Sequence, residues 1–254
     1  MRKLRRYCFL RRRLGRDLLV RRRKAWPGNT RRFARQVSRL PLSALLIRRR
    51  ECEASLVKSA AKKEVRRCRW AQSPAQSQAM TEYHDREWGV PLHDDRQLFE
   101  FLILEGAQAG LSWETILNKR ENYRKAFDSF DPEKIARYDA KKARGLMANA
   151  GIVRNRLKIA AAVSNAQAYQ AVVKEFSSFD SYLWQFAPAQ AKKRDPKAPG
   201  KFVTRTPESD AMSKDLKRRG FRFVGTTICY AFMQAVGMVN DHSPDCFRRP
   251  QIQP

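Results

Sequence analysis

Apolar residues recur at helical spacing along most of the chain after residue 93, and residues that begin or end helices separate the segments. Directly after Asp94-Asp95, one apolar face is formed by Leu98, Phe99, Leu102 and Ile103. Ser112 precedes a second face, and Asp131-Pro132 combines a capping side chain with a proline suited to a first helical turn. A chain with this pattern folds mainly into short helices.

The remaining segments extend the same interpretation. Further helices are predicted over Lys141–Asn149, Asn155–Phe176, Phe179–Phe186, Ser209–Arg219 (closed by Gly220) and Thr226–Val236. Ala187–Thr206 is rich in proline and basic residues, and we predict a loop there. Only Phe221–Val224 alternates as a strand would. We therefore predict an all-α fold.

Charge divides the chain at Cys68. Residues 1–67 hold 24 Lys and Arg against 4 Asp and Glu, whereas the remaining residues hold 29 against 21. We predict a basic, disordered extension over 1–67 and one folded domain over 68–254. A DNA-binding arm and an Arg-rich organelle transit segment are the alternatives for the extension. Its apolar run at 40–47 is too short to span a bilayer.

Four potential metal ligands lie near the two ends of the predicted domain. His242-x-x-x-Cys246 has the short spacing with which one turn of chain presents two ligands to one Zn²⁺, and Cys68 and His84 form a wider pair. A buried cysteine and a surface histidine would explain the same residues without a metal. The five cysteines are odd in number and widely spaced, which indicates a reducing, intracellular setting rather than a disulfide framework.

A carboxylate interrupts an apolar helix face at Glu105. Such a group is costly to bury unless it is paired or meets a cationic ligand. Tyr83, Trp88 and Trp113 lie on either side of it in the sequence, and aromatic faces with one carboxylate suit a flat, positively charged ring. A capping or ion-paired Glu105 among core aromatics is the alternative interpretation.

Long literal runs resemble the DNA-3-methyladenine glycosylase I family. They comprise four stretches: Cys68 to Trp113, Ala150 to Ile159, Phe221 to Ala235, and Val239-Asn240-Asp241-His242-x-x-x-Cys246. The resemblance covers essentially all of residues 68–254 in order. It has three departures: a longer segment between Cys68 and His84, a more basic loop over 192–205, and no counterpart for the extension.

The resemblance implies a helix-hairpin-helix fold and a base excision repair enzyme that flips and hydrolytically removes 3-methyladenine from double-stranded DNA. It implies one structural Zn²⁺ on Cys68, His84, His242 and Cys246. Glu105 would be the catalytic residue that recognises the base, with Tyr83, Trp88 and Trp113 as the base-binding wall. Gly151, Ile152 and Val153 would hold a DNA phosphate, helped by Arg154 and Arg156.

The reaction that this resemblance implies needs little acid catalysis. A base methylated at N3 is cationic and leaves as a neutral molecule, so extrusion and selective binding matter more than acid catalysis. No Asp or Glu occurs between Ala150 and Val173, and no lysine nucleophile lies in the pocket motifs, so we expect a monofunctional enzyme. A DNA-binding module without activity and a zinc hydrolase are the competing functions. We expect a cytoplasmic monomer without membrane contact.

Overall fold

The computed structural model of the protein describes residues 65–72, 77–188 and 203–252. They belong to one compact unit, Val65–Pro254. The predicted extension lies outside the described residues except at its last three positions. Two of these contact the helical unit: Phe247 N–H donates to the Arg66 carbonyl at 2.9 Å, and Arg67 forms a two-pronged ion pair with Asp85. The charge boundary at Cys68 therefore falls three residues inside the compact unit.

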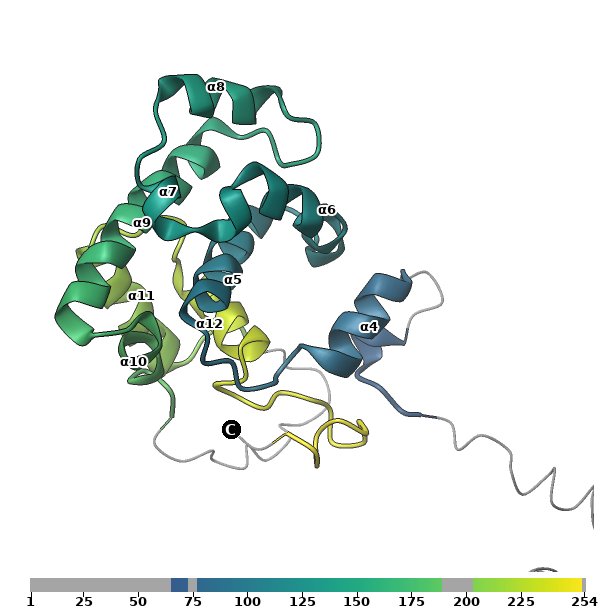
Figure 1. Ribbon diagram of the computed structural model, residues 1–254. Coiled ribbons are helices and arrows are strands. Elements are labelled where there is room, and N and C mark those ends of the chain that lie inside the picture. Colours follow the sequence, from purple (N-terminus) through teal and green to yellow (C-terminus); the bar gives the residue numbers. More distant parts are fainter. Residues whose placement is uncertain (1–64, 73–76, 189–202, 253–254) are drawn as a thin grey trace, which may run out of the picture. The chain divides into compact units, whose positions relative to one another are not determined.

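The described residues form helices and contain no strand, which confirms the all-α prediction (Figure 1). In chain order the elements are η1 (Arg69–Ala71), α4 (Gln78–Arg86), α5 (Asp95–Gln108), α6 (Trp113–Ala126), η2 (Asp128–Phe130), α7 (Pro132–Ile135), α8 (Ala140–Ala148), α9 (Arg156–Phe176), α10 (Phe179–Trp184), α11 (Pro207–Arg218) and α12 (Thr226–Ala235). No helix in these ranges is both long enough and apolar enough to cross a bilayer.

Side-chain caps fix where several helices begin. Asp94 accepts from Gln97 N–H, and Ser112 accepts from Thr115 N–H, as the sequence predicted. Asp131 caps α7 in the same way. The predicted start of α11 at Ser209 is two residues late, because Thr206 forms a reciprocal capping box with Ser209.

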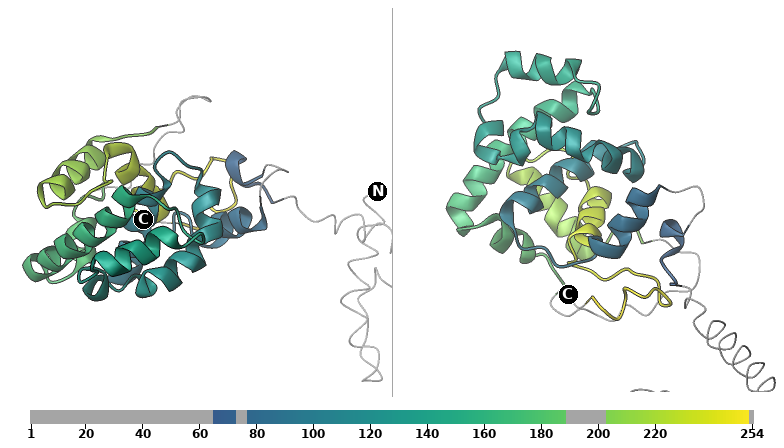
Figure 2. Two further views of the ribbon diagram at one scale, coloured as in Figure 1. Left: turned by 90° about the horizontal axis from the view of Figure 1, so that it is seen from above. Right: turned by 45° about the vertical axis from the view of Figure 1, so that its right-hand side comes forward.

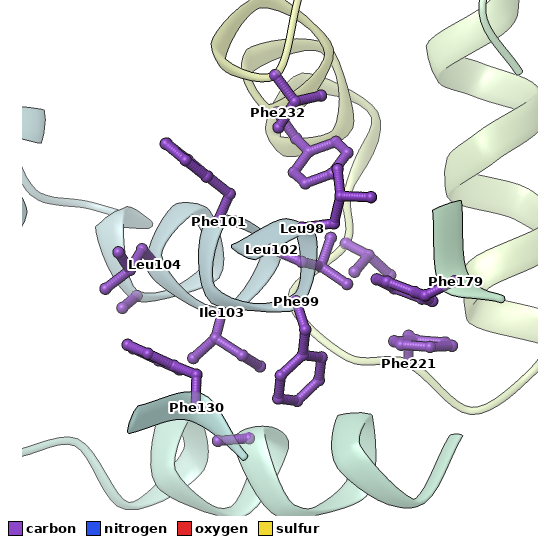
Figure 3. Packing of buried hydrophobic residues seen from close by; sticks show 14 of the residues in the cluster. Leu98, Phe99, Phe101, Leu102, Ile103, Leu104, Phe130, Phe179, Phe221 and Phe232 are labelled. Carbon is purple, nitrogen blue, oxygen red and sulfur yellow. The ribbon is translucent and has the colours of Figure 1, made fainter. Parts of the chain in front are cut away.

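The core surrounds α5. Every residue of this helix from Leu98 to Ala107 is buried, since it packs against α6, α9, α10, α12 and η2. Figure 3 shows Leu98, Phe99 and Leu102 of α5 among aromatic rings that come from distant segments. Phe179 and Phe221, for example, stack at 6.1 Å between ring centroids. A helix that is buried on all sides holds its side chains rigidly, which matters for Glu105 near its end.

Phe221–Val224, the only strand candidate in the sequence, is not a strand. This segment is the connection between α11 and α12, and Phe223 has a φ of +54°, which no extended strand allows. The side-chain amide of Asn165 replaces a strand partner: its oxygen accepts from Arg222 N–H at 2.7 Å and its nitrogen donates to the Arg222 carbonyl at 3.1 Å. The predicted loop at Ala187–Thr206 has no helix or strand in its described residues, and 189–202 lie outside them.

The beginning and end of the unit meet. Residues after α12 run back alongside η1 and α4, as two views show (Figures 1 and 2). Hydrogen bonds from Gly89 N–H to the Ala235 carbonyl and from Leu92 N–H to the Val236 carbonyl fix this approach. Gly237 has a φ of +77°, and a Cβ there would lie 2.4 Å from Pro91 N, so only glycine fits. The meeting of the two ends brings the predicted metal ligands together.

Candidate functional site

Glu105 is buried in the last third of α5, with 4% of its surface exposed. No hydrogen bond or ion pair within the described residues reaches its carboxyl group. Burial alone raises the pKa of Glu105 to about 8. A buried acid without a partner opposes folding, so its presence among the buried residues of α5 indicates a site built for a ligand.

Two aromatic side chains accompany Glu105. The rings of Tyr83 on α4 and Trp113 at the start of α6 lie 5.4 Å apart. Burial raises the pKa of Tyr83, and the charges of Glu105 and Glu87 raise it further, so the phenol lies within the field of Glu105. The indole Nε1–H of Trp113 is buried and has no acceptor among the described residues. The site thus holds an unpaired acid and an unpaired donor beside aromatic faces.

Trp88, predicted for the base-binding wall, packs beside two of the potential metal ligands. Its ring packs 4.6 Å from the His242 ring and 6.2 Å from the His84 ring, measured between centroids. Trp70 of η1 connects the two regions, because it lies 5.1 Å from Trp88 and 6.5 Å from Tyr83. Sequence reasoning missed Trp70. The available signal was its position two residues after Cys68, the first predicted metal ligand.

The structure brings the four predicted metal ligands together. Cys68, His84, His242 and Cys246 are all buried, and their potential ligand atoms lie within 4.8 Å of one another. Cys246 Sγ lies 3.4 Å from both His84 Nε2 and His242 Nδ1, and Cys68 Sγ lies 3.5 Å from His242 Nδ1. Two sulfurs and two imidazole nitrogens facing one point are a donor set that suits a tetrahedral metal.

Hydrogen bonds on the outer side orient both imidazoles. His84 Nδ1 lies 2.8 Å from an Asp85 carboxylate oxygen, which leaves its Nε2 facing the cluster. His242 Nε2 lies 3.1 Å from the Trp88 carbonyl, which leaves its Nδ1 facing the cluster. Burial lowers the pKa of His242 to about 4, so this ring stays neutral, the form that binds a metal. The residues present therefore fit a metal ion.

The predicted DNA-binding hairpin joins α8 to α9. Ile152 belongs to the core, and Gly151 leaves little room for a side chain, since a Cβ would lie 3.0 Å from both Asn122 Cβ and Asn149 Oδ1 and these side chains would have to shift. The three hairpin amides already have acceptors inside the protein: Asn149 Oδ1 for Gly151, the Asn149 carbonyl for Ile152, and Tyr123 Oη for Val153. Arg154 and Arg156, in contrast, are exposed.

Lys158 connects this hairpin region to the end of α5. Its Nζ donates to the carbonyls of Ala107 and Ala109 at 2.7 Å each, at the C-terminal end of α5. A cation there donates hydrogen bonds to carbonyls that have no partner within the helix. Its charge is also attracted to the negative end of the helix dipole. Sequence reasoning gave Lys158 no role, because its acceptors lie about fifty residues earlier in the chain.

Comparison with known proteins shows the family of the chain. The family model for methyladenine glycosylases matches residues 70–249. "DNA-3-methyladenine glycosylase 1" of Escherichia coli (strain K12) is 47% identical over 188 residues, which cover 74% of this chain and 99% of that protein. "DNA-3-methyladenine glycosylase" of Haemophilus influenzae is 46% identical over 180 residues, covering 71% of this chain and 96% of that protein.

Solved structures give the same result. A crystal structure of 3-methyladenine DNA glycosylase I is 50% identical, has a TM-score of 0.67, and is matched over 72% of this chain and 98% of its own. The Staphylococcus aureus enzyme, in a structure described as the basis of 3-methyladenine recognition, is 37% identical with a TM-score of 0.63, over 69% of this chain and 93% of its own.

The helical fold and the family match are those of a DNA N-glycosylase. Within that class, the chain belongs to the methyladenine glycosylase family.

Proposed function

We propose that this chain removes 3-methyladenine from alkylated double-stranded DNA by hydrolysing the N-glycosidic bond, as a monofunctional monomer in base excision repair. The observation that carries the proposal is the buried, unpaired carboxyl group of Glu105 beside Tyr83 and the unpaired indole N–H of Trp113. The relatives named above carry this activity in their names.

The pocket suits the chemistry of the lesion. Adenine methylated at N3 is a flat cation once it is extruded from the DNA stack. A cation beside Glu105 would lower the raised pKa of this acid and turn it into a carboxylate with a counter-ion. The ring of Trp113 offers a stacking face, and its N–H offers a donor. Unmethylated adenine brings no positive charge and leaves Glu105 without its counter-ion.

Bond cleavage then depends on the leaving group. The methylated base departs as a neutral molecule, so Glu105 has to recognise the cation rather than protonate it. The first five turns of α9, which follow the hairpin, contain no Asp or Glu to assist the reaction. We infer that positioning and electrostatic selection of the cationic base supply the catalysis.

The Cys–His cluster supports a second part of the proposal. Cys68, His84, His242 and Cys246 would hold one Zn²⁺. Four protein ligands leave no open coordination position for water or substrate, so the metal would be structural. It would join the segment before α4 to the segment after α12. The closed ligand set also disfavours a zinc hydrolase.

DNA contacts belong to the exposed side chains near the hairpin in this proposal. Arg154 and Arg156 extend from the connection between α8 and α9, where they can reach phosphates. Because the amides of Gly151, Ile152 and Val153 already have internal acceptors, a phosphate would have to share or replace these bonds. The two arginines are therefore the stronger candidates for backbone contact.

Base release tests the proposed function. The full chain is incubated with methylated duplex DNA, and released bases are separated by chromatography. We expect 3-methyladenine release by the wild type and roughly 10- to 100-fold slower release by Glu105→Gln, since a hydrogen bond to a charged group contributes about 1.5–3 kcal/mol. Glu133→Gln, at an exposed position on α7, is the matched control and should match the wild type.

Two outcomes would contradict the proposal in different ways. If the wild type binds methylated DNA but releases no base, the chain is a binding module and the proposed activity is wrong. Equal release by the wild type and Glu105→Gln would contradict the role of Glu105 alone.

A further inference from the structure

A buried arginine lies between the elements that carry the pocket. Arg120 on α6 is 7% exposed. Its Nε donates to Glu100 Oε1 at 2.6 Å, and its Nη1 donates to Glu87 Oε2 at 2.5 Å. The guanidinium also lies 4.9 Å from the centroid of the Phe101 ring. We refer to Arg120, Glu87 and Glu100 as the arginine clamp.

Each member of the arginine clamp stands on an element that bears a pocket group. Glu87 directly follows α4 as its C-cap, and its N–H donates to the Tyr83 carbonyl at 2.9 Å. Glu100 stands on α5, five residues before Glu105. Arg120 follows Trp113 by seven residues on α6, which is about two helical turns. One guanidinium therefore joins the end of α4 to α5 and α6.

We propose that Arg120 is a positioning residue, which sets the spacing of Tyr83, Glu105 and Trp113 and thereby the affinity for the methylated base. This inference rests on the proposed function above. Arg120 itself need not touch the base.

A buried ion pair such as the arginine clamp suits the positioning of α4, α5 and α6 better than a contribution to folding stability. A buried ion pair gives little stability relative to apolar side chains, because both charges lose their hydration, but its geometry is directional. The start of α6 is already held to α4, where Ser77 N–H donates to a Glu114 carboxylate oxygen at 2.9 Å. The clamp holds these two helices again farther along α6, so their relative rotation is fixed as well as their contact.

The carboxylates of the clamp also compensate the positive charge of Arg120, which would otherwise repel a cationic base. Two carboxylates surround Arg120, and Glu100 further binds Arg124 at 2.8 Å. Paired in this way, Arg120 opposes a cationic base only weakly. A Glu87→Gln change would weaken the geometry and leave the Arg120 charge less compensated, and both effects disfavour the methylated base.

Two variants of the full chain test the inference against a matched control. Arg120→Lys keeps the charge but loses the forked donor geometry. Glu87→Gln keeps the shape of a partly exposed partner. Glu121→Gln is the control: Glu121 is 72% exposed and pairs with Arg124 on the outer side, at 2.5 Å. Affinity is measured by calorimetry for free 3-methyladenine and by anisotropy for a duplex that carries an abasic-site analogue.

We expect Arg120→Lys and Glu87→Gln to weaken 3-methyladenine binding roughly 10-fold, since a small displacement of a site residue can cost up to about 100-fold. Binding of the abasic duplex should change less than roughly 2-fold, because phosphate contacts lie near the hairpin. Glu121→Gln should match the wild type in both assays. A merely structural clamp would instead reduce both affinities together.

The outcomes separate this inference from the proposed function. A wild type that does not bind 3-methyladenine contradicts the proposed function. A wild type that binds it, with both clamp variants binding equally well, overturns the positioning role alone. A proportional loss of both affinities in the two variants, including loss through unfolding, also overturns it.

Discussion

Glu105 is the residue on which the site depends, and its protonation has a consequence for stability. Its pKa is about 8 in the folded protein and 4.5 in an ordinary environment. Between these two values the unfolded chain releases a proton that the folded protein retains, so the free energy of unfolding falls as the pH rises from about 4.5 to 8. Folding therefore opposes ionisation of this carboxyl group.

Glu105→Gln removes the ionisable group and should therefore remove the fall in the free energy of unfolding between about pH 4.5 and 8. At pH 5 the variant and the wild type should unfold with similar free energies. At pH 8 the variant should be more stable by at least roughly 1 kcal/mol, because one unit of pKa shift corresponds to about 1.36 kcal/mol. Urea unfolding of both proteins at the two pH values measures the difference. Parallel pH dependences would mean that Glu105 is paired or solvated in solution.

At the residue scale the sequence is informative where a residue conflicts with its local pattern. Glu105 is such a case, because a carboxylate stands where the α5 pattern requires an apolar side chain. Trp88 carries no such conflict. The family resemblance implies its place in the base-binding wall, and in the structure its ring packs on His84 and His242. Arg120 could not be found, since its partners lie 20 and 33 residues away.

At the scale of helices, local capping chemistry predicts where elements begin, and tertiary contacts decide the rest. Asp94, Ser112 and Asp131 cap α5, α6 and α7 as expected, because each cap uses amides only two or three residues away. The Phe221–Val224 segment alternates like a strand but has no neighbouring strand within the described residues, and Asn165 satisfies its backbone instead. Alternation alone does not supply a pairing partner.

The helix α4 shows a second limit of local patterns. It carries Tyr83 and His84, yet no helix is predicted there from the sequence. Its start at Ser77 has no side-chain cap hydrogen bond. Its polar composition leaves only Met80, Tyr83 and His84 buried. Packing on η1 and α6, together with the Cys–His cluster, holds this helix in place.

At the scale of the whole unit, the Cys–His cluster joins segments separated by more than 150 residues. We predict about one Zn²⁺ per wild-type chain and its loss from a double variant with His242→Ala and Cys246→Ala. The melting temperature should fall by more than roughly 5 °C, because each kcal/mol of lost stability lowers it by about 2–4 °C in a protein of this size. Metal analysis and calorimetry on the full chain measure both quantities.

Cys229→Ala is the control for losing a thiol, since Cys229 is buried but stands outside the cluster. It should retain the full metal content. Unchanged zinc and unchanged melting in the double variant would refute the metal site. The spacing of His242 and Cys246 made this pair recognisable in the sequence, whereas the convergence with Cys68 and His84 required the fold.

The pH dependence of kcat/KM for 3-methyladenine release is the most direct test of the proposed cation-selective pocket. This quantity reports the ionisation of the free enzyme, in which the pKa of Glu105 is about 8. For the wild type, kcat/KM should rise roughly 10-fold per pH unit between pH 6 and 7 and level off above pH 8. Glu105→Gln should be slow and independent of pH across this range. A flat wild-type profile, or a variant that keeps the wild-type rate and profile, would contradict the account.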